Sequence, residues 1–296
     1  MKRFWCNIVL VLLSVVGFAQ QQPQMYFEQV SMEDGLSQVS INDIIQDSTG
    51  FLWFATLDGL NRYDGYTFKV FKPEANNPSS ISSNRILSLY LDSYGIIWIG
   101  TLGGGLNEYN PLTETFTRYM HDPNDEHSLS NNDVYDIVED SDGVLWLATY
   151  GGGLNSFDRK THKFTSYKHN PSNLNSIGSN QVRTINIDRL GNLWVGVNEG
   201  GGLDKFDKHT GIFTHVDFIS HDIMKIKSDR HGDLWIGTYY GGFGVMNPET
   251  YQYKVFENNP VDTMSLSNNI VWTFYEDTIT NIMYVGTRGG SYPQRR

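Results

Sequence analysis

Aspartates followed at short spacing by glycine recur along the chain, and this pattern could bind calcium. The segment Asp140-Ser-Asp142-Gly143 begins as a calcium-binding loop does. Such a loop needs further oxygen ligands and a bidentate glutamate, and neither follows at the required spacing. We therefore expect no metal and no cofactor. Instead, each aspartate is expected to accept backbone N–H groups across a turn that its glycine permits, and these are Asp47, Asp92, Asp140, Asp188 and Asp229.

Other residues with catalytic potential do not form a motif. None of the eight histidines has metal-ligand spacing, and no Gly-x-Ser-x-Gly elbow is present. The glycine clusters near residues 103–105 and 151–153 lack the Lys-Ser or Lys-Thr pair of a phosphate-binding loop, so they predict tight hairpins. Asp133 with Asp136 is only weak evidence for glycosidase chemistry, because carboxylates are numerous here. We expect no catalytic residues.

The aspartates belong to a repeat that positions every other feature. A tryptophan follows each one by six residues, and the copies recur at intervals of 41 to 49 residues; the tryptophans are Trp53, Trp98, Trp146, Trp194 and Trp235. In the third copy we expect strands at 134–139, 144–149, 154–158 and 163–167, from alternating apolar residues between turn signals. Four-stranded units of this length match propeller blades. The tryptophans are expected to pack between blades.

The predicted fold is therefore an all-β propeller with five complete blades and part of a sixth. The sixth copy is degenerate, with Tyr284 in place of tryptophan, and its third strand is missing. We expect an incomplete, open propeller of the seven-bladed type, truncated at its C-terminal end. The segment 25–30 has the composition of an outer strand that could complete the last blade.

The first 19 residues have the layout of a secretory signal peptide: a basic start, an apolar run and small residues before Gln20. The propeller domain is then expected at residues 20–296. Cleavage would remove Cys6, the only cysteine, and leave 20 basic and 33 acidic residues, a net charge of −13. Such a surface repels phosphate backbones, so nucleic-acid binding is not expected. No further apolar stretch has membrane length, so no membrane contact is expected after cleavage.

Positions that vary between repeats are the candidates for ligand binding, because shared positions build the blade. In a propeller the first strand of each blade lines the central channel, and the loop after the second strand opens on the same face. Aromatic, arginine and acidic side chains there supply apolar faces with convergent polar groups. The predicted ligand-binding residues are Arg85, Tyr135, Tyr150, Arg183, Glu199, Tyr239, Trp272 and Arg288. The alternative for each is a solvated loop residue.

Several segments resemble repeats of the two-component regulator propeller family. They are Gly50-Phe-Leu-Trp-Phe-Ala-Thr-Leu-Asp-Gly-Leu-Asn-Arg-Tyr-Asp64, Gly95-Ile-Ile-Trp-Ile-Gly-Thr-Leu-Gly-Gly-Gly-Leu-Asn-Glu-Tyr109 and the opening Glu33-Asp-Gly-Leu-Ser-Gln-Val-Ser40. The resemblance extends from Tyr26 to about Gly290. It implies a periplasmic sensor of a hybrid two-component system, commonly tuned to glycans or their breakdown products. It also allows a homodimer in the full-length sensor.

The resemblance also implies that the kinase of such a system is absent from this chain. Members of the family look longer, with about fourteen repeats before a membrane helix and a histidine kinase. This chain then corresponds to an N-terminal fragment and is expected not to be an enzyme. The family motif contains no general ligand residues. Two alternatives remain open: a propeller lyase or hydrolase acting on sugar or anionic substrates, and a scaffold that docks another protein.

Overall fold

A computed structural model describes residues 29–289, and it is built almost entirely of β-strands. One short 3-10 helix, η1 (Met32–Asp34), precedes the first strand. Residues 31–289 belong to one compact unit, and no helix in the described part is long and apolar enough to cross a bilayer. The predicted signal peptide lies outside the described residues, as does most of the segment 25–30.

Five antiparallel sheets of four strands and one of two strands form the propeller blades. Blade 1 contains β1 (Ile41–Gln46), β2 (Leu52–Thr56), β3 (Gly59–Tyr63) and β4 (Phe68–Phe71); blade 2 contains β5 (Ile86–Leu91), β6 (Ile97–Thr101), β7 (Leu106–Asn110) and β8 (Thr115–Tyr119). Blade 3 contains β9 (Val134–Glu139), β10 (Leu145–Thr149), β11 (Gly153–Asp158) and β12 (Lys163–Tyr167); blade 4 contains β13 (Val182–Ile187), β14 (Leu193–Val197), β15 (Gly202–Asp207) and β16 (Ile212–Val216). Blade 5 contains β17 (Ile223–Ser228), β18 (Leu234–Thr238), β19 (Phe243–Met246) and β20 (Tyr253–Phe256); blade 6 contains β21 (Val271–Asp277) and β22 (Ile282–Thr287).

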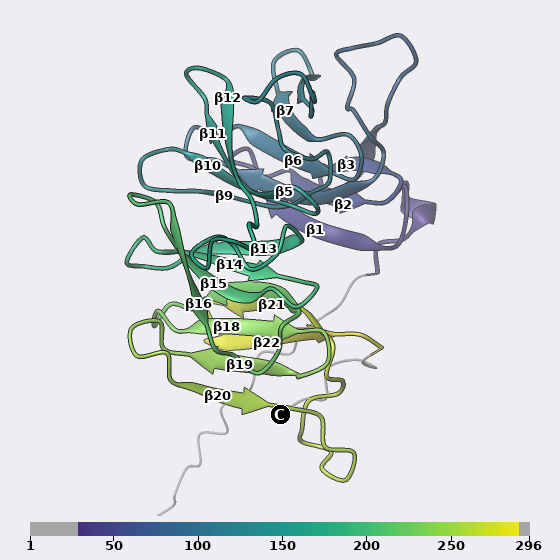
Figure 1. Ribbon diagram of the computed structural model, residues 1–296. Helices are drawn as coiled ribbons and strands as arrows, with labels where there is room; N and C mark the ends of the chain where they lie inside the picture. Colours follow the sequence, from purple (N-terminus) through teal and green to yellow (C-terminus); the bar gives the residue numbers. More distant parts are fainter. Residues whose placement is uncertain (1–28, 290–296) are drawn as a thin grey trace, which may run out of the picture. The chain divides into compact units, whose positions relative to one another are not determined.

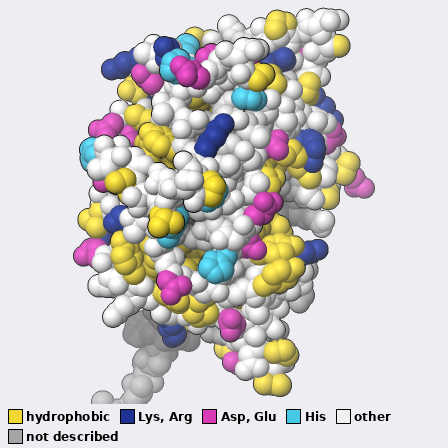
Figure 2. All heavy atoms as spheres, viewed as in Figure 1, with side chains coloured by type: hydrophobic (Ala, Val, Ile, Leu, Met, Phe, Trp, Pro, Cys, Tyr) yellow, Lys and Arg dark blue, Asp and Glu magenta, His cyan; other side chains and the backbone are white. Residues whose placement is uncertain are grey.

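The first strand of each blade is its inner strand. Each inner strand packs against that of the next blade, from β1 through β5, β9, β13 and β17 to β21, and the sheets follow one another in chain order (Figure 1). Five linkers connect successive blades: the first (72–85), second (120–133), third (168–181), fourth (217–222) and fifth (257–270). The fourth has 6 residues and the third has 14. On the face shown in Figure 2, acidic and basic side chains are interspersed.

The repeated aspartate holds both its turn and its tryptophan. In blade 4, Asp188 Oδ1 accepts the N–H groups of Leu190 and Asn192, each at 2.9 Å. Its Oδ2 accepts the indole Nε1–H of Trp194 at 2.9 Å. The same indole bond is 2.8 Å in blade 1, 2.7 Å in blade 2, 2.9 Å in blade 3 and 3.0 Å in blade 5. The turn therefore fixes the indole orientation, a contact that the sequence did not reveal.

Each tryptophan packs against an aromatic ring of the following blade. The Trp53 ring lies 4.8 Å from Tyr109, and Trp98 lies 5.6 Å from Phe157, both edge to face. Trp146 and Phe206 are 5.4 Å apart, and Trp235 and Phe274 are 5.9 Å apart, in the same geometry. These pairs lie inside apolar clusters that span two neighbouring blades. Burial of these rings thus stabilises the interfaces between blades and not only each sheet.

The glycine clusters form the hairpins between second and third strands. Gly105 has a φ of 71°, and its N–H donates to Asn132 of the second linker at 2.9 Å. A Cβ at this position would lie 2.3 Å from the carbonyl oxygen of Tyr119. Glycine is required here because both the backbone conformation and the close approach exclude a side chain.

Replacing Asp188 with alanine is expected to lower the free energy of unfolding by about 1–3 kcal/mol, since it leaves the buried Nε1–H of Trp194 without its acceptor. Equilibrium urea denaturation measures this change. Asp158→Ala, which removes a comparable but exposed turn aspartate, is the control and should cost less. Equal losses in the two variants would show that the indole bond contributes nothing.

Candidate functional site

Each inner strand carries one extra residue, a β-bulge, opposite its partner strand. The pairing skips from Ile41 to Asp43 in blade 1 and from Val182 to Thr184 in blade 4, and the same shift occurs in the other inner strands. The bulged residues are Asn42, Leu87, Tyr135, Arg183, Met224 and Trp272. Bulges redirect side chains and are common beside binding sites. The residue type at this position differs in every blade.

Three of the bulged residues meet around the Arg183 guanidinium. Its carbon lies 4.5 Å from the ring centre of Tyr135, from blade 3, and 5.6 Å from that of Trp272, from blade 6. Tyr150 extends the group, with its ring 5.3 Å from Tyr135. We call Tyr135, Tyr150, Arg183 and Trp272 the aromatic–arginine cluster. Blades that are not neighbours in the chain therefore contribute to one group of side chains.

The Arg183 charge in this cluster has no carboxylate partner. No acidic oxygen in the described part of the chain lies within ion-pair distance of Arg183. Burial lowers the pKa of Arg183, while the charges of Tyr135, Tyr150 and Asp136 oppose that change. Arginine nevertheless stays protonated at any physiological pH. Trp272 keeps 39% of its surface exposed and Arg183 is half-buried, so the cluster offers an exposed aromatic face beside a partly covered cation.

A charged layer lies beside the cluster and was missed by sequence reasoning. Lys225 Nζ, from blade 5, lies 3.0 Å from Asp136 Oδ2, from blade 3. The same oxygen accepts the Thr184 hydroxyl at 2.8 Å and the Ile185 N–H at 3.1 Å. In blade 1, Asp43 Oδ2 accepts the Leu89 N–H of blade 2 at 2.8 Å. The sequence does contain a signal for this layer, because Asp43, Asp136 and Lys225 each directly follow a bulged position.

The pKa values of Asp43 and Lys225 in this layer are both raised. Burial raises the pKa of Asp43, although the charge of Lys225 and the Leu89 N–H oppose it. Burial lowers the pKa of Lys225, but the charges of Asp136 and Asp43 outweigh it and raise the value overall. Lys225 therefore stays charged and joins the carboxylates of blades 1 and 3. Asp136 pairs with Lys225, and Asp133 Oδ1 accepts the Gly103 N–H at 2.7 Å, so the two carboxylates have different partners.

The remaining predicted site residues lie on loops at varying distances from the cluster. The Glu199 charge raises the pKa of Tyr150, after the larger effect of burial, so this glutamate faces the cluster. Tyr239 stacks edge to face on Tyr240 at 4.4 Å, and Arg288 influences that pair electrostatically. Arg85 is exposed, and no hydrogen bond or ion pair joins its side chain to another described residue. A role in ligand binding stays a prediction for all eight residues.

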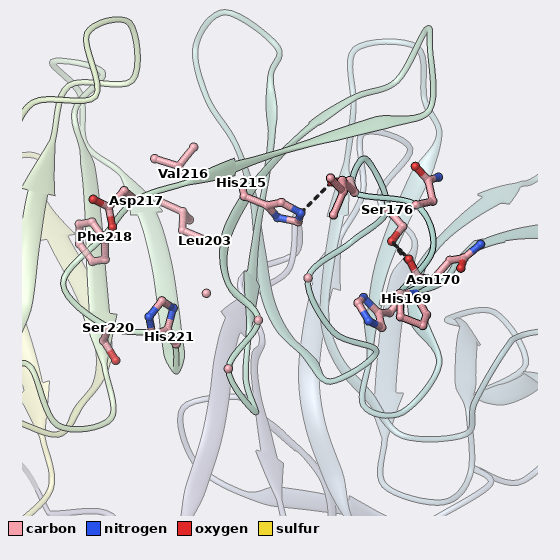
Figure 3. Close-up of a pocket in the computed structure, with 17 residues that line it drawn as sticks. His169, Asn170, Ser176, Leu203, His215, Val216, Asp217, Phe218, Ser220 and His221 are labelled. Atoms are coloured by element: carbon pink, nitrogen blue, oxygen red, sulfur yellow. Dashed lines mark hydrogen bonds between the residues drawn. The ribbon is translucent and has the colours of Figure 1, made fainter.

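A hollow of about 460 Å³ lies elsewhere, on blade 4, and sequence reasoning did not find it. The third linker, the turn at 200–202 and the segment 215–221 line it (Figure 3). Leu203, Val216 and Phe218 supply apolar lining, and His169 and His215 supply polar lining. The sequence signal was the short fourth linker, which contributes four of the lining residues. No group of three or more potential metal ligands occurs there or elsewhere in residues 29–289.

Blades of this construction, with a conserved turn geometry and inner-strand bulges, define a β-propeller with a variable inner surface. The family model described as "two component regulator propeller" matches residues 35–58, 80–103 and 128–151. The chain therefore carries repeats of the two-component regulator propeller family.

Relatives agree with this assignment. The extracellular domain of the putative hybrid two-component system BT3049 from B. thetaiotaomicron has a TM-score of 0.72 and 29% identity over 89% of this chain and 40% of its own. The extracellular domain of the putative hybrid two-component system BT4673, from the same organism, has a TM-score of 0.68 and 25% identity over 83% of this chain and 34% of its own. Histidine kinase P4 from Formosa agariphila is 38% identical over 76 residues, 26% of this chain and 6% of that protein. The chain thus spans well under half the length of these relatives.

Virginiamycin B lyase from Staphylococcus aureus shares the fold alone. It has a TM-score of 0.62 and 13% identity, over 84% of each chain.

Proposed function

We propose that this chain is the ligand-sensing propeller module of a hybrid two-component system, exported to the periplasm. Three observations support the proposal: the propeller repeats, the likeness to extracellular domains of such systems, and the match to a histidine kinase. The kinase activity would belong to another part of the signalling protein. The chain itself contributes recognition and not catalysis.

The observation that carries this proposal furthest is the aromatic–arginine cluster. Sugar rings present apolar C–H faces that pack on aromatic side chains and hydroxyls that accept hydrogen bonds from arginine. Trp272 supplies an exposed ring, and Arg183 supplies donors that no carboxylate in the described part occupies. We infer that the ligand is an oligosaccharide, a breakdown product of a glycan or a similar polar molecule.

Signalling from this cluster requires that the ligand favour one of two conformations. Arg183, Tyr135 and Trp272 come from blades 4, 3 and 6, so a ligand that touches all three would fix the relative positions of those blades. A ligand that makes more contacts in one arrangement of the blades than in another would shift the population of conformations toward that arrangement, as a sensor requires.

A panel of oligosaccharides, screened first by thermal shift and then by calorimetric titration, tests the proposal. Replacing Arg183 with methionine is expected to weaken binding more than tenfold, because hydrogen bonds from a charged donor are lost. Tyr66→Ala, which alters a ring 90% exposed in blade 1, should leave affinity unchanged. Binding that is insensitive to Arg183→Met would contradict this assignment, and sustained turnover of a sugar would contradict the sensor role.

A further inference from the structure

Blade 4 differs from blades 1 to 3 at one buried position on its third strand. In the first three blades an asparagine accepts the N–H of a serine and donates its side-chain N–H to the hydroxyl of that serine; the pairs are Asn61 with Ser37, Asn107 with Ser82 and Asn155 with Ser130. In blade 4 the asparagine is replaced by Asp204 and the serine by Gly178. Gly178 N–H still donates to Asp204, at 2.8 Å, but the second bond is gone.

His215 takes the place of the lost bond. It lies opposite Asp204 on the neighbouring strand, and its Nδ1 is hydrogen-bonded to Asp204 Oδ1. Its Nε2 lies 3.1 Å from the carbonyl oxygen of Leu174 in the third linker. The side chain of Asp204 is fully buried and that of His215 is 50% exposed. Both ring nitrogens therefore face oxygen acceptors, and only the imidazolium has the two N–H groups to satisfy them.

The equivalent position in other blades shows what His215 does. In blade 2 it is occupied by Arg118, whose guanidinium donates to the carbonyl oxygens of Ser80 at 2.7 Å and Asn77 at 2.9 Å in the first linker. In blade 3 it is Ser166, and no side-chain bond from Ser166 to the second linker is present. Arg118 is a permanent cation, whereas histidine changes its charge between about pH 5 and pH 8. Blade 4 thus has a titratable residue where blade 2 has a fixed charge.

The linker that His215 contacts forms one wall of the 460 Å³ hollow on blade 4 (Figure 3). The fourth linker has only 6 residues, against 14 in the third, and also contributes to the lining. The position of the third linker therefore determines how open the hollow is.

We propose that His215 and Asp204 form a proton-controlled clamp that holds the third linker over this hollow. The protonated ring bonds Asp204 and the Leu174 carbonyl together, and the clamp is closed. When the ring loses its Nε2 proton, a lone pair faces the carbonyl oxygen, and within the described residues the linker keeps only the backbone bond from the Phe213 N–H to the Asn175 carbonyl oxygen as its tie to this strand, β16. The clamp operates independently of any ligand at the aromatic–arginine cluster.

Several titratable groups lie around His215, and one of them touches its ring. Asp204 is the carboxylate in contact with the ring, and Asp217, His169 and His221 line the same hollow. Burial raises the pKa of Asp204, although the Gly178 N–H and His215 oppose that change. A raised carboxyl pKa means that Asp204 holds its proton more tightly in the folded state. The contribution of this group to folding stability is therefore present at low pH and lost as pH rises. Protonation of Asp204 itself would remove the negative charge that holds the imidazolium, so the clamp is closed while His215 is protonated and Asp204 is ionised.

Amide hydrogen exchange on the full chain tests the clamp, with exchange rates expressed as protection factors to remove the intrinsic effect of pH. The Asn173 and Ser176 amides report on the third linker, because both are bonded within it. The Asn77 and Ser80 amides make the matching bonds in the first linker, held by Arg118, and are the reference. The ratio of third-linker to first-linker protection is expected to fall about tenfold between about pH 5.5 and 8.

Two variants and one direct measurement separate the clamp from general pH effects. His215→Arg copies Arg118 and should make the ratio independent of pH. The double variant Asp204→Asn, His215→Ser gives blade 4 the asparagine and serine of blade 3 at these two positions and should give low, pH-independent protection; Gly178 is kept, because a Cβ there would lie 2.4 Å from the Gly201 carbonyl oxygen. Imidazole ¹⁵N shifts of the unmodified protein should show two protonated nitrogens on His215 at pH 5.5 and one at pH 8. A ratio that does not change with pH, or that changes equally in His215→Arg, would overturn the proposal.

Discussion

Replacing Trp194 with alanine is expected to lower the free energy of unfolding by about 3–5 kcal/mol, the largest single effect we predict. The side chain is fully buried between blades 4 and 5, in a cluster with Ile223, Ile226 and Leu234. Its removal leaves a cavity at a blade interface and also removes the indole donor of Asp188. Urea denaturation followed by circular dichroism measures the loss.

Trp272→Ala is the matched control for this prediction. It deletes the same side chain, but from an exposed position outside the interface clusters. We expect a loss of about 1 kcal/mol or less, typical of surface substitutions. If the two variants lose similar stability, the tryptophans do not act as packing between blades.

Replacing Lys225 with methionine is expected to cost about 2 kcal/mol at pH 7, with little change of volume. Breaking a buried ion pair typically costs about 3–5 kcal/mol, and we reduce that value because the Lys225 side chain is 34% exposed. The variant leaves Asp136 and Asp43 without their shared cation. Urea denaturation at several pH values measures the effect.

The pH dependence of this variant has a definite sign. The pKa of Asp43 is already raised by burial, and loss of Lys225 removes a charge that lowers it. A carboxyl whose folded pKa lies above its unfolded value stabilises the fold at low pH and loses that contribution as pH rises through the folded pKa. The difference between wild type and Lys225→Met should therefore shrink between about pH 7 and pH 4.5. A difference that is constant, or that grows in acid, would exclude this charged layer as the cause.

Much of the fold could be predicted because its strand boundaries are set by local chemistry. In blade 3, the predicted strands at 134–139 and 163–167 agree with β9 and β12, and those at 144–149 and 154–158 differ from β10 and β11 by one residue. The Asp-x-x-Gly turn and the glycine hairpin end each strand at positions the sequence displays. The number of blades in the complete propeller stays a prediction.

The site could be predicted only in part because it depends on distances across the channel. The variability of Arg183, Tyr135 and Trp272 among the repeats predicts a role in binding, but their convergence depends on how successive blades rotate, which no local pattern encodes. The pairing of Lys225 with Asp136 joins residues 89 positions apart. By contrast, Asp204 could have been found, since alignment of the repeats places it where the earlier blades have asparagine.

Ligand titration followed by tryptophan fluorescence tests the central claim most directly. The other five blade tryptophans are buried or half-buried, so Trp272 is the one in the described residues that a ligand at the aromatic–arginine cluster would touch. An oligosaccharide identified by the screen should change the emission of the unmodified protein, and Trp272→Phe should lose that change while calorimetry still detects binding. If Trp272→Phe retains the full change in emission, the ligand binds elsewhere and the aromatic–arginine cluster is not the sensing site.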